Sequence, residues 1–265
     1  MNHDTAALLE IATSTAAEAA ALIVDGLSRA RTMVDTKTTG TDMVTEMDKA
    51  SEALILGRLA DARPSDAVLG EEGTDRPGST GVRWIVDPID GTTNYLYGHA
   101  GFAISIAAEI DGEIAVGVVH DPLHGEVFTA LRGQGAFRNG LPIHASTETD
   151  LSHALVATGF SYEPDRRRRQ AAVLAKIIGS LRDIRRMGAA SVDLCSVACG
   201  RVDAYYERGL QPWDHAAGAL IATEAGARVG NLTGGAVEFE FCLAAPPALF
   251  DELRVLLIDA DAANA

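Results

Sequence analysis

The chain has 265 residues, of which 47% are hydrophobic and only 5% aromatic, so mainly Ala, Val, Leu and Ile must fill its core. The formal net charge of −15 argues against direct, nonspecific binding to nucleic acid, whose phosphates attract basic proteins. No signal-peptide pattern opens the chain and no apolar run approaches the ~20 residues of a membrane span, which predicts no membrane partner.

The first part of the chain predicts two helices followed by a strand. Residues 5–28 are rich in Ala and carry larger apolar residues at helical spacing, which is typical of a long amphipathic helix. A polar connector at residues 35–41 precedes a second helix at about residues 45–59. Residues 82–86 are an apolar run that predicts a buried strand, and Pro88, which cannot donate to a ladder, is expected to stop it.

The next part predicts short strands joined by tight turns. Residues 102–107 are expected to pair with residues 114–119 across the turn at Asp111 and Gly112. A further strand at residues 127–129 and a turn at Asn139 continue the pattern, which indicates an antiparallel meander.

Beyond Asp150, strands and helices alternate. The sequence therefore predicts an α/β chain with an α+β half at residues 1–148 and an α/β half at residues 149–265, joined without a linker. The expected strands cover residues 155–158, 183–186, 204–206 and 242–245, and the expected helices cover residues 165–181, 190–199, 215–225 and 247–258.

The three cysteines are Cys195, Cys199 and Cys242, an odd number. Cys195 and Cys199 are one helical turn apart in an apolar pattern, which favours buried thiols over a redox pair. A reducing, cytoplasmic location is therefore expected.

Residues 84–94, which read WIVDPIDGTTN, are the most informative stretch. Asp87 ends the predicted strand, Asp90 follows closely, and residues 91–93 read as the start of a helix. Two neighbouring carboxylates repel each other, and a divalent cation offsets that repulsion, while the free N–H groups of a helix N-terminus suit a phosphate. This pattern suggests phosphoryl chemistry, but D-P-x-D-G is also a good turn by itself.

Four further segments bear on this choice. These four segments and residues 84–94 resemble the motifs of the inositol monophosphatase family and follow one another in the order found in that family. The resemblance extends over nearly the whole chain and is greatest to the bacterial inositol-1-monophosphatase branch. The resemblance implies a layered α-β-α-β-α sugar-phosphatase fold and a phosphomonoester hydrolase. The segments are residues 70–73 (GEEG), 133–140 (GQGAFRNG), 186–190 (RMGAA) and 212–218 (PWDHAAG).

The resemblance also implies a magnesium site. Two cations ~3.5–4 Å apart can activate a water and stabilise the leaving alkoxide, and Mg²⁺ prefers oxygen ligands. A third, weaker ion is implied near Glu71, with Glu72 at its border. By resemblance, Glu71, Asp87 and the Ile89 carbonyl bind the first ion, and Asp87, Asp90 and Asp214 bind the second.

The resemblance places Thr92 beside the attacking water. A hydroxyl is a poor base and needs a carboxylate behind it, and Asp48 corresponds to the family's aspartate in that role. Glu71 is counted with these two as catalytic. The alternative for Asp48 is structural, because Thr45-x-x-Asp48 is also a capping-box pattern.

Substrate contacts are implied in two groups. The phosphate is expected at Gly91, Thr92 and Thr93, and the substrate hydroxyls at Asp90, Gly188, Ala189, Ala190, Glu207 and Asp214. For Glu207, the alternative is an ordinary exposed acid at a strand end. Lys37 is a further candidate, although a lysine in a polar loop is usually solvated. The basic run at residues 166–169 favours a solvated helix face, with a subunit contact or attraction of the anionic substrate as the alternatives.

The resulting hypothesis is a Mg²⁺-dependent, lithium-sensitive phosphatase that acts as a homodimer on myo-inositol 1-phosphate or a similar polyol phosphate. Alternatives that keep the chemistry are fructose 1,6-bisphosphate, histidinol phosphate and 3′-phosphoadenosine 5′-phosphate. An alternative of another class is a regulatory binding protein with subordinate catalysis, since some bacterial relatives bind transcription machinery.

Overall fold

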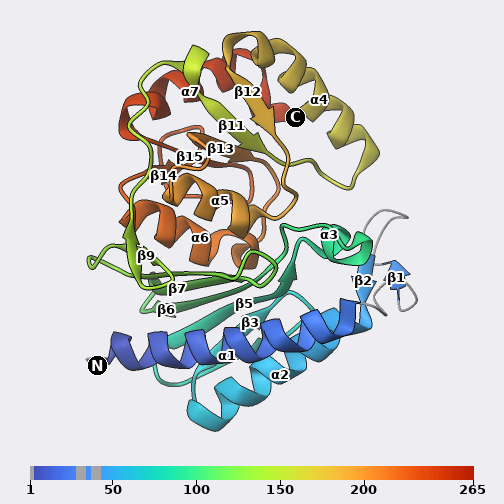
Figure 1. Cartoon of the computed structure of the whole chain (residues 1–265), viewed down its shortest axis with the longest axis vertical. Coiled ribbons are helices and arrows are strands. Elements are labelled where there is room, and N and C mark those ends of the chain that lie inside the picture. Colours follow the sequence, from blue (N-terminus) through green and yellow to red (C-terminus); the bar gives the residue numbers. More distant parts are fainter. Residues whose placement is uncertain (1–2, 28–33, 37–42) are drawn as a thin grey trace.

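The computed structural model describes residues 3–27, 34–36 and 43–265, and its helices and sheets form layers (Figure 1). An outer pair of helices covers an eight-stranded sheet, a central pair separates it from a five-stranded sheet, and a last pair covers the other side. The predicted α/β class and α-β-α-β-α order are therefore confirmed. The pairs are α1 (Thr5–Gly26) with α2 (Glu46–Ala62), α5 (Ala190–Ala198) with α6 (Pro212–Glu224), and α4 (Pro164–Ile177) with α7 (Pro247–Asp259).

The first sheet contains the expected meander. All of its strand pairs are antiparallel except β3 with β5. Asp111 and Gly112 have φ values of 51° and 89°, which a two-residue turn between β6 and β7 requires. In spatial order the strands are β10 (Leu141–Ile143), β9 (Ala136–Arg138), β8 (Glu126–Leu131), β7 (Glu113–Asp121), β6 (Ala103–Ile110), β5 (Val82–Asp90), β3 (Ala67–Gly70) and β4 (Asp75–Arg76).

The second sheet is mixed. Strands β12, β11 and β13 are parallel, while β15 and β14 are antiparallel to their neighbours. The helix expected at residues 165–181 ends at Ile177, because a 3₁₀ turn follows at Ile178–Ser180. In spatial order the strands are β12 (Asp183–Arg185), β11 (Leu155–Thr158), β13 (Ala204–Glu207), β15 (Cys242–Ala245) and β14 (Arg228–Gly230).

A small third sheet replaces part of the expected polar connector. β1 (Val34–Thr36) pairs antiparallel with β2 (Met43–Thr45), and α2 begins directly after β2. The connector prediction is wrong at its start, because three-residue strands are too short to show an alternating pattern. Lys37 lies outside the described residues.

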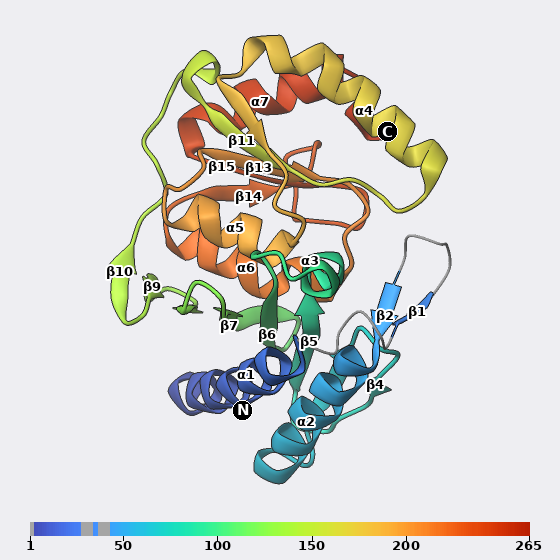
Figure 2. The ribbon, with the colours of Figure 1, turned by 45° about the vertical axis from the view of Figure 1, so that its right-hand side comes forward.

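Helix α1 lies against the outer face of the first sheet (Figure 2). Ala12, Ala16 and Ala19 are fully buried there, and such small side chains allow close approach to β6 and β7. The statement that no apolar run approaches the length of a membrane span is wrong, because α1 is long and apolar enough to cross a membrane by length and composition alone. Its buried face packs in the core with α2 and the sheet.

The two sheets share the central helix layer. One hydrophobic core unites Ile85 of the first sheet, Tyr205 of the second, and the buried faces of α5 and α6. The chain leaves the first sheet after β10 and enters the second at β11, on either side of residue 148. The division into residues 1–148 and 149–265 stays a prediction.

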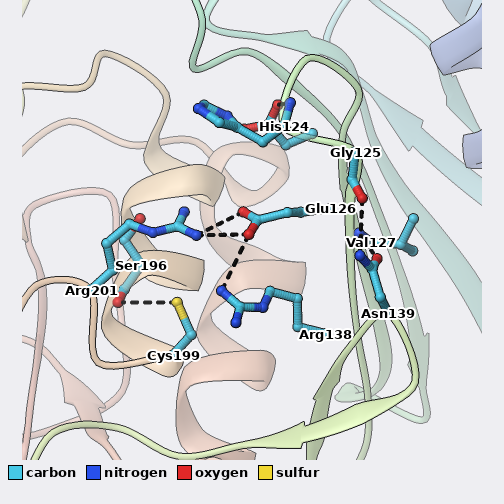
Figure 3. A network of polar contacts seen from close by, with 10 residues as sticks. His124, Gly125, Glu126, Val127, Arg138, Asn139, Ser196, Cys199 and Arg201 are labelled. Atoms are coloured by element: carbon cyan, nitrogen blue, oxygen red, sulfur yellow. Dashed lines mark hydrogen bonds and ion pairs between the residues drawn. The ribbon is translucent and has the colours of Figure 1, made fainter.

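A charged network also joins the two parts of the chain (Figure 3). Glu126 on β8 accepts hydrogen bonds from Arg138 on β9 at 3.2 Å and from Arg201, which follows α5, at 2.8 Å and 2.9 Å. A carboxylate bridging two guanidiniums forms strong, oriented bonds, so this network holds the meander against the end of α5.

The cysteines are unpaired, as expected. Cys195 and Cys242 are buried, but Cys199 at the end of α5 is only half-buried, and its thiol donates to the carbonyl of Ser196 at 3.7 Å. The prediction of buried thiols, made for Cys195 and Cys199, is therefore confirmed for Cys195 and wrong for Cys199.

Candidate active site

The end of β5 carries the paired carboxylates. The expected stop at Pro88 is wrong, because β5 continues to Asp90. Its pairing with β6 is irregular between Asp87 and Asp90, so the missing N–H of Pro88 interrupts no regular ladder. The Pro88 carbonyl accepts a hydrogen bond from Ser51 of α2 at 2.9 Å, and Asp87 Oδ1 accepts one from the Ile89 N–H at 3.0 Å.

A cavity of about 190 Å³ opens at this end of the strand. Of the residues predicted for the site, Asp48, Glu72, Thr93 and Ala189 do not line this cavity. Those that do are Glu71, Asp87, Ile89, Asp90, Gly91, Thr92, Gly188, Ala190, Glu207 and Asp214.

Asp48 nevertheless reaches the site through Thr92. The Asp48 side chain is fully buried, and its Oδ1 lies 3.3 Å from Thr92 Oγ1. The same hydroxyl lies 3.1 Å from the Ile89 carbonyl. A hydroxyl has one hydrogen, so when that hydrogen points to Asp48, a lone pair is left to accept from a water. The capping alternative depends on the side chain of Thr45, of which the structure describes only the backbone, at the end of β2.

Glu52 is a supporting residue that sequence analysis missed. Its buried carboxylate accepts from the Glu72 N–H at 2.9 Å and from Thr74 Oγ1 at 2.6 Å, so it fixes the turn that presents Glu71. Asp48, Ser51 and Glu52 follow the i, i+3, i+4 spacing of one helix face. That spacing is the signal that could have identified Glu52.

Asp90 connects the first sheet to the central helices. Its Oδ2 accepts from the Ser191 N–H in the first turn of α5 at 2.7 Å, a favourable place for a carboxylate. Asn94 of α3 (Thr92–Tyr97) donates to the carbonyls of Gly101 at 2.6 Å and Met187 at 2.7 Å. These bonds bring the segment before Gly188 against the end of β5.

Asp214 lies within a helix rather than before one. The helix expected at residues 215–225 begins earlier, because Pro212 occupies a first-turn position of α6 and Gln211 caps it. Asp214 Oδ2 accepts from the Gln211 N–H at 2.6 Å, as in a capping box. The carboxylate is therefore held in a fixed position at the cavity.

The clustered acids perturb one another. Burial raises the pKa of Asp87 well above its usual range, and the carboxylates of Glu71, Asp90 and Asp214 raise it further. The pKa of Asp214 is also raised, first by burial and then by Asp90. Burial raises the pKa of Asp90, although hydrogen bonds from Ser191 counter part of this shift.

These residues fit a divalent cation. Asp87 and Asp90 are 2% and 7% exposed, and a positive charge between them would offset both their burial and their repulsion. All the donors are oxygens, which suits Mg²⁺. Among the residues that the structure describes, no three His, Cys, Asp or Glu side chains form a ready-made coordination cluster.

Glu207 is not an exposed acid, so that alternative is wrong. Its half-buried carboxylate lines the cavity and accepts from the Tyr205 hydroxyl at 2.7 Å. Burial raises the pKa of Glu207 to about 7, although the Tyr205 hydrogen bond and the nearby Arg186 guanidinium counter part of this shift.

Three arginines line the cavity and were not predicted to do so. Arg166 belongs to the basic run at residues 166–169, which was expected on a solvated face. Arg166 lines the cavity and residues 167–169 do not, so the expectation is wrong for Arg166. Arg186 precedes Gly188 in the chain, and Arg208 follows Glu207. Each carries its charge beside the acids, so the cavity is not uniformly negative.

Comparison with known proteins agrees with the sequence resemblance. The profile of the inositol monophosphatase family matches residues 4–257. The inositol-1-monophosphatase of Mycobacterium bovis is 44% identical over 278 aligned residues, covering 97% of this chain and 95% of that protein. The Nus factor SuhB of Escherichia coli K12 is 41% identical, with 86% of each chain covered. The extragenic suppressor protein suhB of Bartonella henselae has a TM-score of 0.90 and 35% identity, covering 95% of this chain and 98% of its own.

Proposed function

Because the chain belongs to the inositol monophosphatase family of metal-dependent phosphatases, we propose that it is a Mg²⁺-dependent phosphomonoesterase for myo-inositol 1-phosphate or a similar polyol phosphate. The products are the alcohol and inorganic phosphate. The main support is the convergence of Glu71, Asp87, Asp90 and Asp214 on one cavity beside Thr92. Four acids around a small cavity need a cationic partner, and Mg²⁺ also suits an anionic substrate.

Phosphate release from a panel of esters tests this proposal. We expect the highest kcat/KM with inositol 1-phosphate, compared with fructose 1,6-bisphosphate, histidinol phosphate and 3′-phosphoadenosine 5′-phosphate. A better rate with another ester would change the substrate and keep the chemistry. No release from any ester, with Mg²⁺ present, would contradict the proposed reaction.

Each group of residues has a distinct role in this proposal. Bound Mg²⁺ would lower the pKa of the attacking water and stabilise the leaving alkoxide. Glu71, Asp87, Asp90, Asp214 and the Ile89 carbonyl would hold two ions, with a third near Glu71 and Glu72. Thr92, oriented by Asp48, would accept a hydrogen bond from the water and hold it in line with the phosphorus. Gly91, Thr92 and Thr93 would bind the phosphate through the start of α3, which has only six residues.

Thr92 and Asp48 are expected to act as one unit. Thr92→Ala and Asp48→Asn should each lower kcat, because either change removes the orientation of the water. The double variant should be little worse than the worse single variant, as for residues of one relay. The measurement is kcat for all four proteins. Losses that multiply would mean that Asp48 acts only as a buried residue of α2.

Glu207 is expected to select for polyols. Glu207→Gln should lower kcat/KM for inositol 1-phosphate about 10- to 150-fold, the cost of losing one charge-assisted hydrogen bond. Hydrolysis of p-nitrophenyl phosphate, which has no sugar hydroxyls, should change little.

The pH profile gives a second measurement on the same variant. Since the Glu207 pKa is raised to about 7, its carboxylate forms as pH rises through that value. Wild-type kcat/KM for inositol 1-phosphate should therefore rise with pH around 7, and the profile of Glu207→Gln should lack this rise. Equal losses on both substrates would place Glu207 in the catalytic machinery or the fold.

A regulatory role is the second candidate, because the Escherichia coli relative is a Nus factor. Such a role would reside on the surface and would not need the cavity acids. A pulldown compared with phosphate release separates the two, since a site variant that binds partners normally but has lost activity would show that the roles are independent.

We also propose a homodimer in the reducing cytoplasm, to be tested by light scattering and fractionation.

A further inference from the structure

A second, larger cavity lies beside α6, and we refer to it as the α6 cavity. Its volume is about 490 Å³. Ligand sites typically measure roughly 300–1,000 Å³, so the α6 cavity has room for a small molecule. It shares no lining residue with the cavity at the end of β5. Its apolar lining comes from β5, α6, β14 and the loop after β14, and consists mainly of Ile85, Ala216, Ala219, Leu220, Val229 and Val237.

The charged residues that line the α6 cavity already have partners. Arg83 on β5 pairs with Glu109 on β6 at 2.8 Å. Arg132 pairs with Glu113 at 3.1 Å. Glu224 at the end of α6 accepts hydrogen bonds from two N–H groups of the β8–β9 turn, at 2.7 Å and 2.9 Å. A charge that leaves water needs a partner of opposite sign, so this lining favours a neutral ligand.

His215 is a polar side chain of the α6 cavity that a ligand could use. The half-buried imidazole takes part in none of the hydrogen bonds or ion pairs found between described residues. The Thr223 hydroxyl, in contrast, donates to the Ala219 carbonyl within α6 at 2.8 Å. An uncharged imidazole has one donor and one acceptor nitrogen, so it can bind one N–H or O–H group of a ligand.

The first turn of α6 connects the two cavities. Helix α6 lies between the two sheets (Figure 1). Pro212 and His215 line the α6 cavity, while Asp214 lines the cavity at the end of β5. The geometry of this one turn sets the 2.6 Å bond from the Gln211 N–H to Asp214 Oδ2. Because a packed helix transmits contacts as a unit, a ligand against Pro212 and His215 would act on the carboxylate of Asp214.

We propose that the α6 cavity is a regulatory site for a neutral, largely apolar small molecule with one N–H or O–H group. The apolar lining supplies most of the affinity, and His215 orients the ligand. The bound ligand restrains the first turn of α6, so the bond between Gln211 and Asp214 opens less often. This inference goes beyond the proposed phosphatase function and does not depend on it.

Calorimetric titration with indole, in EDTA, tests the binding site. Indole should bind with a Kd of about 1 mM or tighter, as for a small fragment. Benzofuran has nearly the same shape but no N–H group, and should bind about two- to tenfold more weakly. His215→Phe should remove the difference between the two probes. Ala219→Phe should fill the cavity and abolish binding, while Ala171→Phe, on the exposed side of α4, is the matched control and should bind as the wild type does.

Amide hydrogen exchange tests the effect on Asp214. Saturating indole should slow exchange of the Gln211 N–H by about fivefold or more, which is the lower end of usual coupling between sites. The Ser191 N–H is the matched control, because it donates to Asp90 at 2.7 Å from the neighbouring helix. Its exchange should stay unchanged. Neither measurement uses a metal ion or an ester, so both can be interpreted even if the phosphatase proposal fails.

The outcomes decide each part of the inference. No saturable binding of indole, or binding that survives in both His215→Phe and Ala219→Phe, would overturn the site. Binding that leaves the exchange of the Gln211 N–H unchanged would overturn its regulatory role. If Ala219→Phe changes the molecular mass measured by light scattering, the face belongs to a contact with a second copy, which also overturns the inference. A loss of phosphate release alone would contradict only the proposed function.

Discussion

Asp87→Asn is expected to lower kcat by several orders of magnitude. The carboxylates of Glu71, Asp90 and Asp214 raise the pKa of Asp87 in addition to burial. The substitution keeps the side-chain size but removes the charge that would bridge two ions, so both would bind weakly. Steady-state kinetics with saturating Mg²⁺ is the measurement. Retention of more than about a tenth of the activity, a loss of only ~1.4 kcal/mol in transition-state stabilisation, would contradict the assignment.

The same variant should be more stable than the wild type without metal. A raised pKa means that the folded protein holds the Asp87 proton more tightly than the unfolded chain does. Ionised Asp87 therefore destabilises the fold at neutral pH, and this penalty fades as pH falls toward the ordinary carboxyl value. In EDTA at pH 7, Asp87→Asn should raise Tm by a few degrees, since ~1 kcal/mol corresponds to about 2–4 °C for a chain of this size. A lowered Tm would show that the kinetic loss comes from a damaged fold.

Removal of divalent cations should abolish phosphate release. The acids that line the cavity offer only oxygen ligands to a metal ion. Once the ions are removed, nothing in the site lowers the pKa of the attacking water. EDTA should stop turnover and added Mg²⁺ should restore it, while Ca²⁺ should inhibit because it takes a larger, looser shell. From the family resemblance, Li⁺ should inhibit as well. Full activity in EDTA would end the metal hypothesis.

A measurement without turnover supports the same conclusion. Mg²⁺ that binds only the folded protein must raise Tm, by an amount that grows with the logarithm of its concentration above Kd. We expect this shift in the wild type and its loss in Asp87→Asn. Arg185→Gln, which changes a paired surface residue, should behave as the wild type. A shift that survives in Asp87→Asn would place the ion elsewhere.

Local chemistry made much of the fold predictable. The Asp111-Gly112 turn was identified because few residue pairs accept positive φ at both positions. The apolar run before Asp87 similarly marked β5 as a buried strand. Strands β3 and β4, with four and two residues, carry no comparable pattern and were missed.

Features that depend on distant partners were not predictable. Pro88 stays within β5 because the neighbouring strand pairs irregularly there, a fact that no local pattern contains. Arg166 and Arg168 belong to the same run of arginines, so the local sequence does not distinguish them. In the fold, Arg166 lines the cavity and Arg168 pairs with Asp165 on the surface. The four acids were identified through motif resemblance. Helical spacing could have identified Glu52, but its bonds to Glu72 and Thr74 are known only from the fold.

The bond from the Ser191 N–H to Asp90 has a consequence for how this enzyme could diversify. It fixes the reacting end of the cavity to the first sheet and the start of α5, whereas Tyr162 comes from the β11–α4 connection and Arg166 from the first turn of α4. Mutations in that connection can alter which alcohol is accepted, while the acids at the reacting end of the cavity remain unchanged. New specificities can therefore evolve by drift in one surface segment, without passing through an inactive ancestor.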